Sequence, residues 1–185
     1  MKKSIFVVLC LSVLFVANCQ NKEKVSDKRT QEQEAMAMQR INEYERILEI
    51  NPNDLEILTA LGNVYYDVGR WDKAVENYLK VLAIDSTDVN VRTDMGTAYK
   101  QMGLYDLAER EFKKGIEIDP KHSKAHYNLG VVYHDQGKYK ETLAEWEKSY
   151  DLEQDPYFKE TAKRNIEQLK QMSGESTSLL PPAKR

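Results

Sequence analysis

Three segments of this chain repeat one pattern: Leu61-Gly62-Asn63-Val64-Tyr65, Met95-Gly96-Thr97-Ala98-Tyr99 and Leu129-Gly130-Val131-Val132-Tyr133. Their glycines and their tyrosines recur every 34 residues. Outside these segments, three further columns keep the same step of 34 residues, namely Gly69, Gly103 and Gly137, then Trp71, Tyr105 and Tyr139, then Tyr78, Phe112 and Trp146. Five columns in register indicate that the chain is built from three copies of one structural unit.

Each column predicts a role in a helix–turn–helix unit. A glycine inside a helix costs about 1 kcal/mol relative to alanine, so the column of Gly62 is predicted to let the second helix of the unit pack close. The column of Gly69 is predicted to end the first helix in a left-handed conformation, and the column of Trp71 to begin the second helix. The column of Tyr78 is predicted to supply large anchors between adjacent units. Asn53 or Asp54 is predicted to cap the first helix of the first unit.

The period of 34 residues with Leu-Gly-x-x-Tyr resembles the tetratricopeptide repeat family. The resemblance implies an all-α fold, a right-handed α-solenoid of three helix pairs over residues 55–88, 89–122 and 123–156, with one flanking helix at each end. No segment alternates apolar and polar residues with a period of two, so no β-sheet is expected.

The pattern continues on both sides of the three units. Residues 31–54 are predicted to hold an N-terminal flanking helix, because Tyr44 and Ile50 match the end of a second helix. Asp155-Pro156 is predicted to open a C-terminal helix over residues 157–172, which would solvate the exposed end of the solenoid. One face of this helix carries Ala162, Ile166 and Leu169.

The N-terminus has the layout of a secretory signal. Lys2 and Lys3 precede the apolar run Ile5–Ala17, which is too short to span a bilayer as a helix. Val16-Ala17-Asn18-Cys19 resembles a bacterial lipobox, although Asn18 stands where Ala, Gly or Ser is usual. We therefore predict a signal peptide over residues 1–18 and lipidation of Cys19; a cleaved signal with an incidental cysteine is the alternative.

The segments outside the helices complete the expected layout. Residues 19–30 read as a lipidated tether, and residues 173–185, with Pro181-Pro182, as a disordered tail. The predicted location is the bacterial cell envelope, on the periplasmic face of the outer membrane, with the membrane reached only through the N-terminal lipid. The protein is expected to be a monomer.

Composition and motifs exclude several classes of function. The formal net charge is −3 with interspersed charges, so no basic stripe indicates nucleic acid. His122 and His126 are four residues apart, but no glutamate follows His122 as a zinc protease motif requires, and packing is the expected role of His126. No nucleophile elbow or phosphate loop is present. We therefore predict no enzyme, no cofactor and no metal site.

The resemblance also implies where a partner would bind. In this family the first helix of each unit lines a concave groove through six positions. These are Glu56, Thr59, Ala60, Asn63, Tyr66 and Asp67 in the first unit, Asn90, Thr93, Asp94, Thr97, Lys100 and Gln101 in the second, and Lys124, Tyr127, Asn128, Val131, His134 and Asp135 in the third. The candidates for partner contact are Thr59, Asn63, Tyr66, Asn90, Asp94, Thr97, Lys124, Tyr127, Asn128, Val131 and His134.

One subfamily binds the C-terminal carboxylate of chaperones through Lys and Asn in the first repeat, Asn in the second, and Lys and Arg in the third. This chain has Thr59, Asn63, Asp94, Lys124 and Asn128 at those positions. Only Asn63 and Lys124 agree, and Asp94 would repel a carboxylate. We therefore predict that the groove has no carboxylate clamp.

These observations favour a membrane-anchored adaptor of the cell envelope that binds a segment of an unidentified partner protein in its groove. A second hypothesis is a periplasmic chaperone that holds unfolded clients during maturation or assembly. Two segments, Arg92–Gly103 and Asn128–Tyr133, resemble repeat domains of cytochrome c maturation factors, although most of their residues are common to the whole repeat family.

Overall fold

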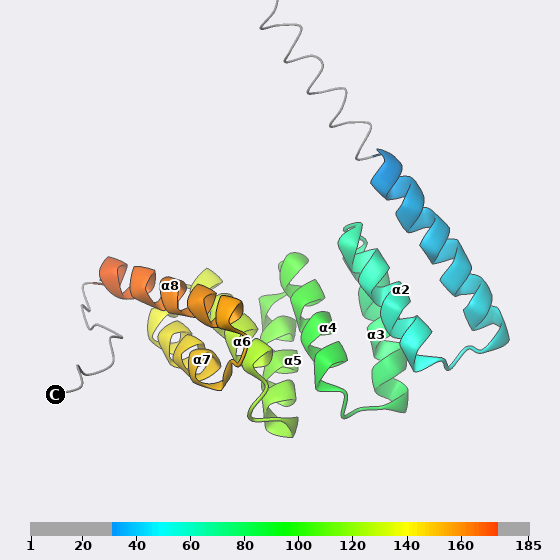
Figure 1. Cartoon of the computed structure of the whole chain (residues 1–185). Helices are drawn as coiled ribbons and strands as arrows, with labels where there is room; N and C mark the ends of the chain where they lie inside the picture. Colours follow the sequence, from blue (N-terminus) through cyan, green and yellow to red (C-terminus); the bar gives the residue numbers. More distant parts are fainter. Residues whose placement is uncertain (1–30, 174–185) are drawn as a thin grey trace, which may run out of the picture.

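The computed structural model describes residues 31–173. The predicted signal peptide, lipidated tether, Cys19 and nearly all of the predicted tail lie outside the described residues. The described chain is a row of helices packed side by side, with no strand among them (Figure 1). A helix over residues 31–50 comes first. It is followed by α2 (Leu55–Asp67), α3 (Trp71–Ile84), α4 (Val89–Gln101), α5 (Tyr105–Ile118), α6 (Ser123–Asp135), α7 (Tyr139–Leu152) and α8 (Pro156–Ser173).

This architecture confirms the predicted all-α solenoid of three helix pairs with a flanking helix at each end. Repeat one is α2 with α3, repeat two is α4 with α5, and repeat three is α6 with α7. We call α2, α4 and α6 the A helices, and α3, α5 and α7 the B helices. The C-terminal helix α8 is one residue longer at each end than the predicted range of 157–172.

The A helices begin and end through local side-chain and backbone chemistry. Asp54 caps α2 by accepting the Ile57 N–H at 3.1 Å, and Asp88 caps α4 by accepting the Val91 N–H at 3.0 Å. After α2, Gly69 adopts a φ of 76° and its N–H donates to the Tyr66 carbonyl, while the Arg70 N–H donates to the Tyr65 carbonyl. This is a Schellman turn, which requires a left-handed residue at the position of Gly69.

The glycine within each A helix allows its B helix to approach closely. A Cβ added to Gly62 would lie 2.6 Å from the Tyr78 ring, and a Cβ added to Gly96 would lie 2.7 Å from the Phe112 ring. The corresponding Cβ on Gly130 would overlap the Trp146 indole. The predicted large anchors thus lie against the A helix of their own repeat, a contact that our prediction of anchors between adjacent units did not include.

The core runs the length of the solenoid between the A and B helices. Its first part joins Ile41 of the N-terminal helix to repeats one and two, and Leu58 and Tyr78 of that part are about 1% exposed. At the other end, Ile166 and Leu169 of α8 pack with Leu143 and Trp146 of α7. The predicted apolar face of α8 is buried, with Ala162 2%, Ile166 0% and Leu169 3% exposed.

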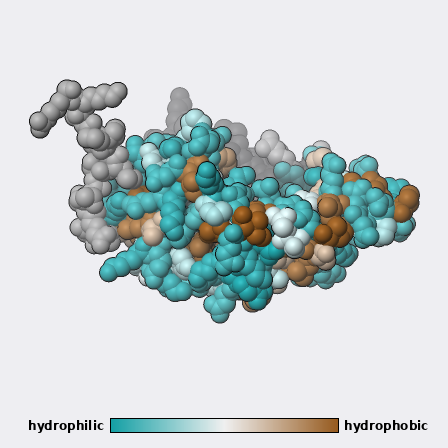
Figure 2. Space-filling view, turned by 90° about the horizontal axis from the view of Figure 1, so that it is seen from below, coloured by the Kyte–Doolittle hydropathy of each residue, from teal (hydrophilic) through white to brown (hydrophobic). Residues whose placement is uncertain are grey.

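The surface is mainly polar on the side of the turns between repeats. Figure 2 shows hydrophobic residues there as separate patches within a hydrophilic surface. Within residues 31–173, no helix combines the length and the apolar character that a membrane span requires.

Candidate protein-binding groove

The three A helices form one continuous face because their polar side chains bond from repeat to repeat. Gln101 of α4 donates to the Tyr66 hydroxyl of α2 at 3.1 Å. Asn128 of α6 donates to the Thr97 hydroxyl of α4 at 3.3 Å. We call this face the A-helix groove. It brings residues that are about 34 positions apart in the sequence within hydrogen-bond distance of one another.

A first cavity of about 350 Å³ opens in the A-helix groove at repeats one and two. Its lining residues are Asn63, Tyr66, Asp67, Tyr78, Asp94 and Thr97. We call it the Asp94 pocket. The Tyr78 hydroxyl donates to Asn63 Oδ1 at 2.7 Å, so the hydroxyl end of this anchor residue lies in the pocket wall. Four of the predicted contact residues, Asn63, Tyr66, Asp94 and Thr97, therefore share one cavity.

The electrostatics of this pocket are dominated by carboxylates. Burial raises the pKa of Asp94 to about 6, while Lys124 acts in the opposite direction and Asp88 adds to the increase. Burial, together with the charges of Asp94 and Asp67, also raises the pKa of Tyr78 above its ordinary range. The pocket therefore resists a further negative charge.

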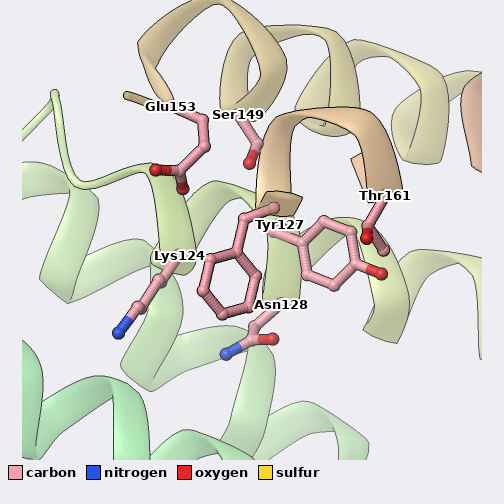
Figure 3. A pocket seen from close by; sticks show the side chains of 7 residues that line it. Lys124, Tyr127, Asn128, Ser149, Glu153 and Thr161 are labelled. Carbon is pink, nitrogen blue, oxygen red and sulfur yellow. The ribbon is translucent and has the colours of Figure 1, made fainter. Parts of the chain in front are cut away.

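A second cavity, of about 270 Å³, lies where repeat three meets the C-terminal helix. It is lined by Lys124, Tyr127 and Asn128 of α6, Ser149 of α7, Glu153 just after α7, and Phe158 and Thr161 of α8. We call it the Tyr127 pocket. Figure 3 shows the Tyr127 ring between Asn128 and Thr161, with the Lys124 amine directed away from that ring.

Tyr127 is held in place on several sides. Its hydroxyl accepts a hydrogen bond from Asn165 of α8 at 2.7 Å, and its ring stacks on Trp146 with centroids 6.0 Å apart. The Trp146 Nε1 donates to the Tyr127 carbonyl at 3.1 Å. By contrast, Phe158 is 53% exposed. The pocket thus combines a fixed aromatic wall with an accessible apolar one.

The other predicted contact residues lie outside the two cavities. Thr59 is half-buried on α2. Asn90 bonds through Oδ1 to the His122 Nε2 at 3.1 Å, Val131 packs against the core of repeat three, and His134 stacks on Trp146 with centroids 5.8 Å apart. Among these four, the exposed side chains of Asn90 and His134 are the ones that a partner could reach most readily.

One groove position assigned by the resemblance is wrong. Thr93 is 3% exposed, and its hydroxyl donates to the Val89 carbonyl at 2.7 Å. Thr97 makes the same kind of bond back to its own helix and still lines the Asp94 pocket, so burial is what separates the two threonines. Thr93 is therefore not available to a partner.

Sequence reasoning missed the pocket residues that come from outside the A helices. Ser149, Glu153, Phe158 and Thr161 line the Tyr127 pocket, and Tyr78 lines the Asp94 pocket. The resemblance to the tetratricopeptide repeat family assigned the groove to the A helices alone, so residues of the B helices and of α8 were not considered. The exposed Tyr157-Phe158 pair at the start of α8 was a signal that could have identified the apolar wall.

His122 and His126 have structural roles. His122 Nδ1 accepts the Ala125 N–H at 3.1 Å and so caps α6, and burial lowers the pKa of His122. His126 is buried between Glu145 and the Pro120 carbonyl, at 2.6 Å and 3.1 Å. Across residues 31–173, no three His, Cys, Asp or Glu side chains are grouped so that they could hold a metal ion.

Comparison with known families accounts for this geometry. A model described as TPR repeat matches residues 62–103 and 96–137, and models described as tetratricopeptide repeat match residues 43–76 and 123–156. Together the matches span more than half of the chain. Among curated protein sequences, none matches the chain.

Solved structures share the fold. The crystal structure of MamA aligns with a TM-score of 0.65 and 26% identity, covering 73% of this chain and 77% of MamA. The TPR domain of Sgt2 from Aspergillus fumigatus aligns with a TM-score of 0.59 and 25% identity, covering 71% of this chain and 87% of that domain.

A third solved structure is the first TPR of Spaghetti (RPAP3) bound to the HSP90 peptide SRMEEVD. It aligns with a TM-score of 0.59 and 21% identity, covering 65% of this chain and 93% of that one, and it shows likeness of fold alone. From the family matches and the fold together, the chain belongs to the tetratricopeptide repeat family, whose fold serves as a scaffold for protein–protein interaction.

Proposed function

We propose that this tetratricopeptide repeat protein is an adaptor of the bacterial cell envelope, held to a membrane by a lipid on Cys19, and that its A-helix groove binds an extended segment of a partner protein. The observation that carries the groove part is the continuous polar face of α2, α4 and α6 with its two cavities. Asparagine amides and tyrosine rings on such a face suit an extended backbone, because amides offer both a donor and an acceptor.

The proposed groove differs from one that reads a free C-terminus. In Spaghetti a peptide of an HSP90 chain is bound on the same fold. Here Asp94, whose pKa is raised by burial, lies where a carboxylate would have to approach. We expect the partner segment to be internal to its chain, or to bind without using its terminal carboxylate.

The anchoring part rests on the sequence of residues 1–19. Lys2 and Lys3, the apolar run and Cys19 follow the order of a bacterial lipoprotein signal. A lipid on Cys19 would hold the solenoid near the membrane surface, with residues 20–30 as a spacer. Local concentration at the membrane would then favour partners that are themselves in the envelope.

The first experiment captures the partner in cells. Wild-type protein with a C-terminal tag is crosslinked, purified and analysed by mass spectrometry beside a groove variant, Asn63→Ala with Lys124→Ala. The matched control is Lys80→Ala with Glu117→Ala, because both side chains are exposed on B helices. One dominant envelope protein, lost only in the groove variant, is the expected result.

Other results of this experiment contradict the proposal in different ways. Many unrelated secreted chains, captured equally, would replace the adaptor with a chaperone that holds unfolded clients. A partner that is kept in the groove variant as it is in the control would move the binding surface away from the A helices. Thermal unfolding of every variant establishes that loss of capture is not loss of folding.

The second experiment tests the anchor independently of the groove. Cells are labelled with an alkyne fatty acid, and wild type is compared with Cys19→Ala. We expect label and membrane association in wild type and neither in the variant. Unlabelled wild-type protein in the soluble envelope fraction would show that Cys19 is an incidental cysteine after a cleaved signal.

A further inference from the structure

The Asp94 carboxylate lies in the wall of a cavity without a direct partner. Within residues 31–173 no side chain or backbone group donates a hydrogen bond to it, and no cation forms an ion pair with it. Among the described cations, only Lys124 on α6 acts on the Asp94 carboxylate. Its charge lowers the pKa of Asp94, but by less than burial raises it. The Asp94 oxygens reach solvent in the cavity, so a ligand donor would replace water on a carboxylate that burial already disfavours.

The Tyr78 and Thr97 hydroxyls offer a ligand acceptors only, whereas the Asn63 amide and the Tyr66 hydroxyl, which accepts from Gln101, keep hydrogens to donate. The Tyr78 hydroxyl hydrogen is directed to Asn63, and the Thr97 hydroxyl hydrogen to the Thr93 carbonyl at 2.9 Å. With these hydrogens committed, the hydroxyl oxygens retain only lone pairs. Asp67 on α2 adds a second carboxylate to the lining. The two carboxylates are the charged groups of the lining, so a donor group with a positive charge complements the pocket best.

We propose that the Asp94 pocket binds a lysine or arginine side chain of the partner segment. The inference rests on the proposed function, because it assigns the chemistry of one partner residue in the A-helix groove. The cavity of about 350 Å³ has room for one long side chain, and Tyr66 in its lining places an aromatic side chain beside the two carboxylates. The Asp94 and Asp67 carboxylates accept charge-assisted hydrogen bonds from the cation.

Proton linkage gives the proposal a second signature. The groups facing Asp94 are Tyr66 and Asp67 of α2, Tyr78 of α3, Asp88 at the start of α4 and Lys124 of α6. The pKa of Asp94 is about 6 in the free protein, so most of the population is protonated at pH 5 and almost none at pH 7.5. A bound cation favours the ionised form, and binding therefore strengthens as the pH rises through 6.

The first test uses a small probe whose chemistry is known. N-methylguanidinium chloride is titrated into the folded protein at pH 7.5, and amide resonances are followed by NMR, with sodium chloride at equal ionic strength as the reference. We expect saturable shifts at Asp67, Asp94 and Thr97, and an affinity that falls at least about threefold at pH 5 because the Asp94 charge is lost. Asp94→Asn should abolish saturation, whereas Glu117→Gln, an exposed acid on α5, should not.

Two outcomes of this titration would overturn the proposal. Shifts that follow ionic strength alone would show that no cation is bound. Saturable shifts that persist unchanged in Asp94→Asn would place the cation elsewhere. A pair of capped pentapeptides, Gly-Ser-Arg-Ser-Gly and its citrulline analogue, extends the test to a peptide, because citrulline keeps the shape of arginine without its charge. Equal affinity for the two peptides would also count against the proposal.

The partner-capture experiment separates this inference from the function on which it rests. If the partner is lost in Asn63→Ala with Lys124→Ala and also in Asp94→Asn, both stand. If it is lost in the groove variant but kept in Asp94→Asn, the groove binds a partner and the cationic anchor is wrong. If the groove variant and the B-helix control both keep it, the proposed function itself fails.

Discussion

Repeats two and three use different side chains for the same structural task. In repeat two, Arg92 Nη1 donates to Glu111 Oε2 at 2.7 Å and Nη2 to the Ser86 carbonyl at 2.8 Å. In repeat three, the residue 34 positions later is His126, whose ring nitrogens lie 2.6 Å from Glu145 Oε2 and 3.1 Å from the Pro120 carbonyl. In each case one nitrogen-bearing side chain of the A helix joins the B helix to the preceding turn.

Repeat one shows that the charged bridge is not required by the fold. Leu58 stands at the position of Arg92 and is 1% exposed, and Asn77 stands at the position of Glu111. The fold requires a filled volume between the two helices, and the sequence can fill it with a leucine–asparagine pair or with an ionic pair. A buried ionic pair adds little net stability. Removing one partner nevertheless destabilises the fold strongly, because the other charge is left buried and unpaired.

The largest expected effect comes from breaking the bridge of repeat two. Arg92→Ala leaves the Glu111 carboxylate with its side chain only 4% exposed, although Arg110 still lies 3.0 Å away. We expect the free energy of unfolding to fall by about 3 kcal/mol, measured by urea denaturation followed by circular dichroism. Replacing both partners by the pair of repeat one, Arg92→Leu with Glu111→Asn, should recover most of that loss. A double variant as unstable as the single one would contradict this account.

A smaller effect is expected in repeat three. Glu145 keeps a bond to Lys148 at 3.1 Å and its side chain is 15% exposed, so it tolerates the loss of His126 better. We expect His126→Ala to cost about 2 kcal/mol in the same denaturation assay. His126→Arg, which copies repeat two, should cost less than half as much, since guanidinium can reach two acceptors. Equal losses would show that volume, and not the bridge, determines the stability.

These bridges mark the boundary of what the sequence could predict. The columns of Gly62, Gly69 and Trp71 predicted the helix pairs. Close approach of two helices, a left-handed turn and the start of a helix are local requirements, and each one restricts the residue type at a fixed position of the repeat. The ion pair between Arg92 and Glu111 joins two helices, so no short sequence pattern indicates it. Repeat one has no such ion pair at the same positions. Such pairs become visible only when the helices are placed in space.

The A-helix groove was predictable only in part for the same reason. The resemblance to the repeat family predicted Asn63, Asp94 and Tyr127 as groove residues, and these residues line the two cavities. It could not predict that Thr93 bonds back to its own helix, or that Phe158 of α8 closes the Tyr127 pocket. Those outcomes depend on a rotamer and on the position of a flanking helix, and neither is encoded in the repeat.

Asp94 offers a third comparison, since Asn128 stands at its position in repeat three. The Asp94 pKa is raised from 3.8 to about 6, so the folded state holds the proton more tightly than the unfolded state. Ionisation therefore destabilises the fold as the pH rises from 3.8 to 6, by at most about 3 kcal/mol and by about 1 kcal/mol once partial exposure is considered. Asp94→Asn should thus be more stable than wild type at pH 7.

The pH profile makes this prediction specific. The advantage of Asp94→Asn should be constant above pH 6, shrink as the pH falls and vanish below 3.8, in denaturation curves recorded across that range. Glu117→Gln, on the exposed surface of α5, should show no such window. An advantage that persists at pH 3.5 would mean that the amide stabilises the pocket by a contact of its own and not by removing a charge.

The smallest effect concerns Gly115, which stands in repeat two where repeat three has Ser149. Unlike the glycines of the A helices, Gly115 has room for a Cβ, with the nearest atom at 3.5 Å on Val89. Alanine at this helical position removes backbone entropy from the unfolded chain, so Gly115→Ala should raise the free energy of unfolding by about 0.5–1 kcal/mol. Gly96→Ala is the matched contrast, because its Cβ would lie 2.7 Å from the Phe112 ring and must displace it. The same mutation should therefore stabilise one helix of repeat two and destabilise the other. Destabilisation by both would show that the contact between α5 and α6 tolerates less than its geometry indicates, since Ala125 lies only 3.9 Å from that Cβ.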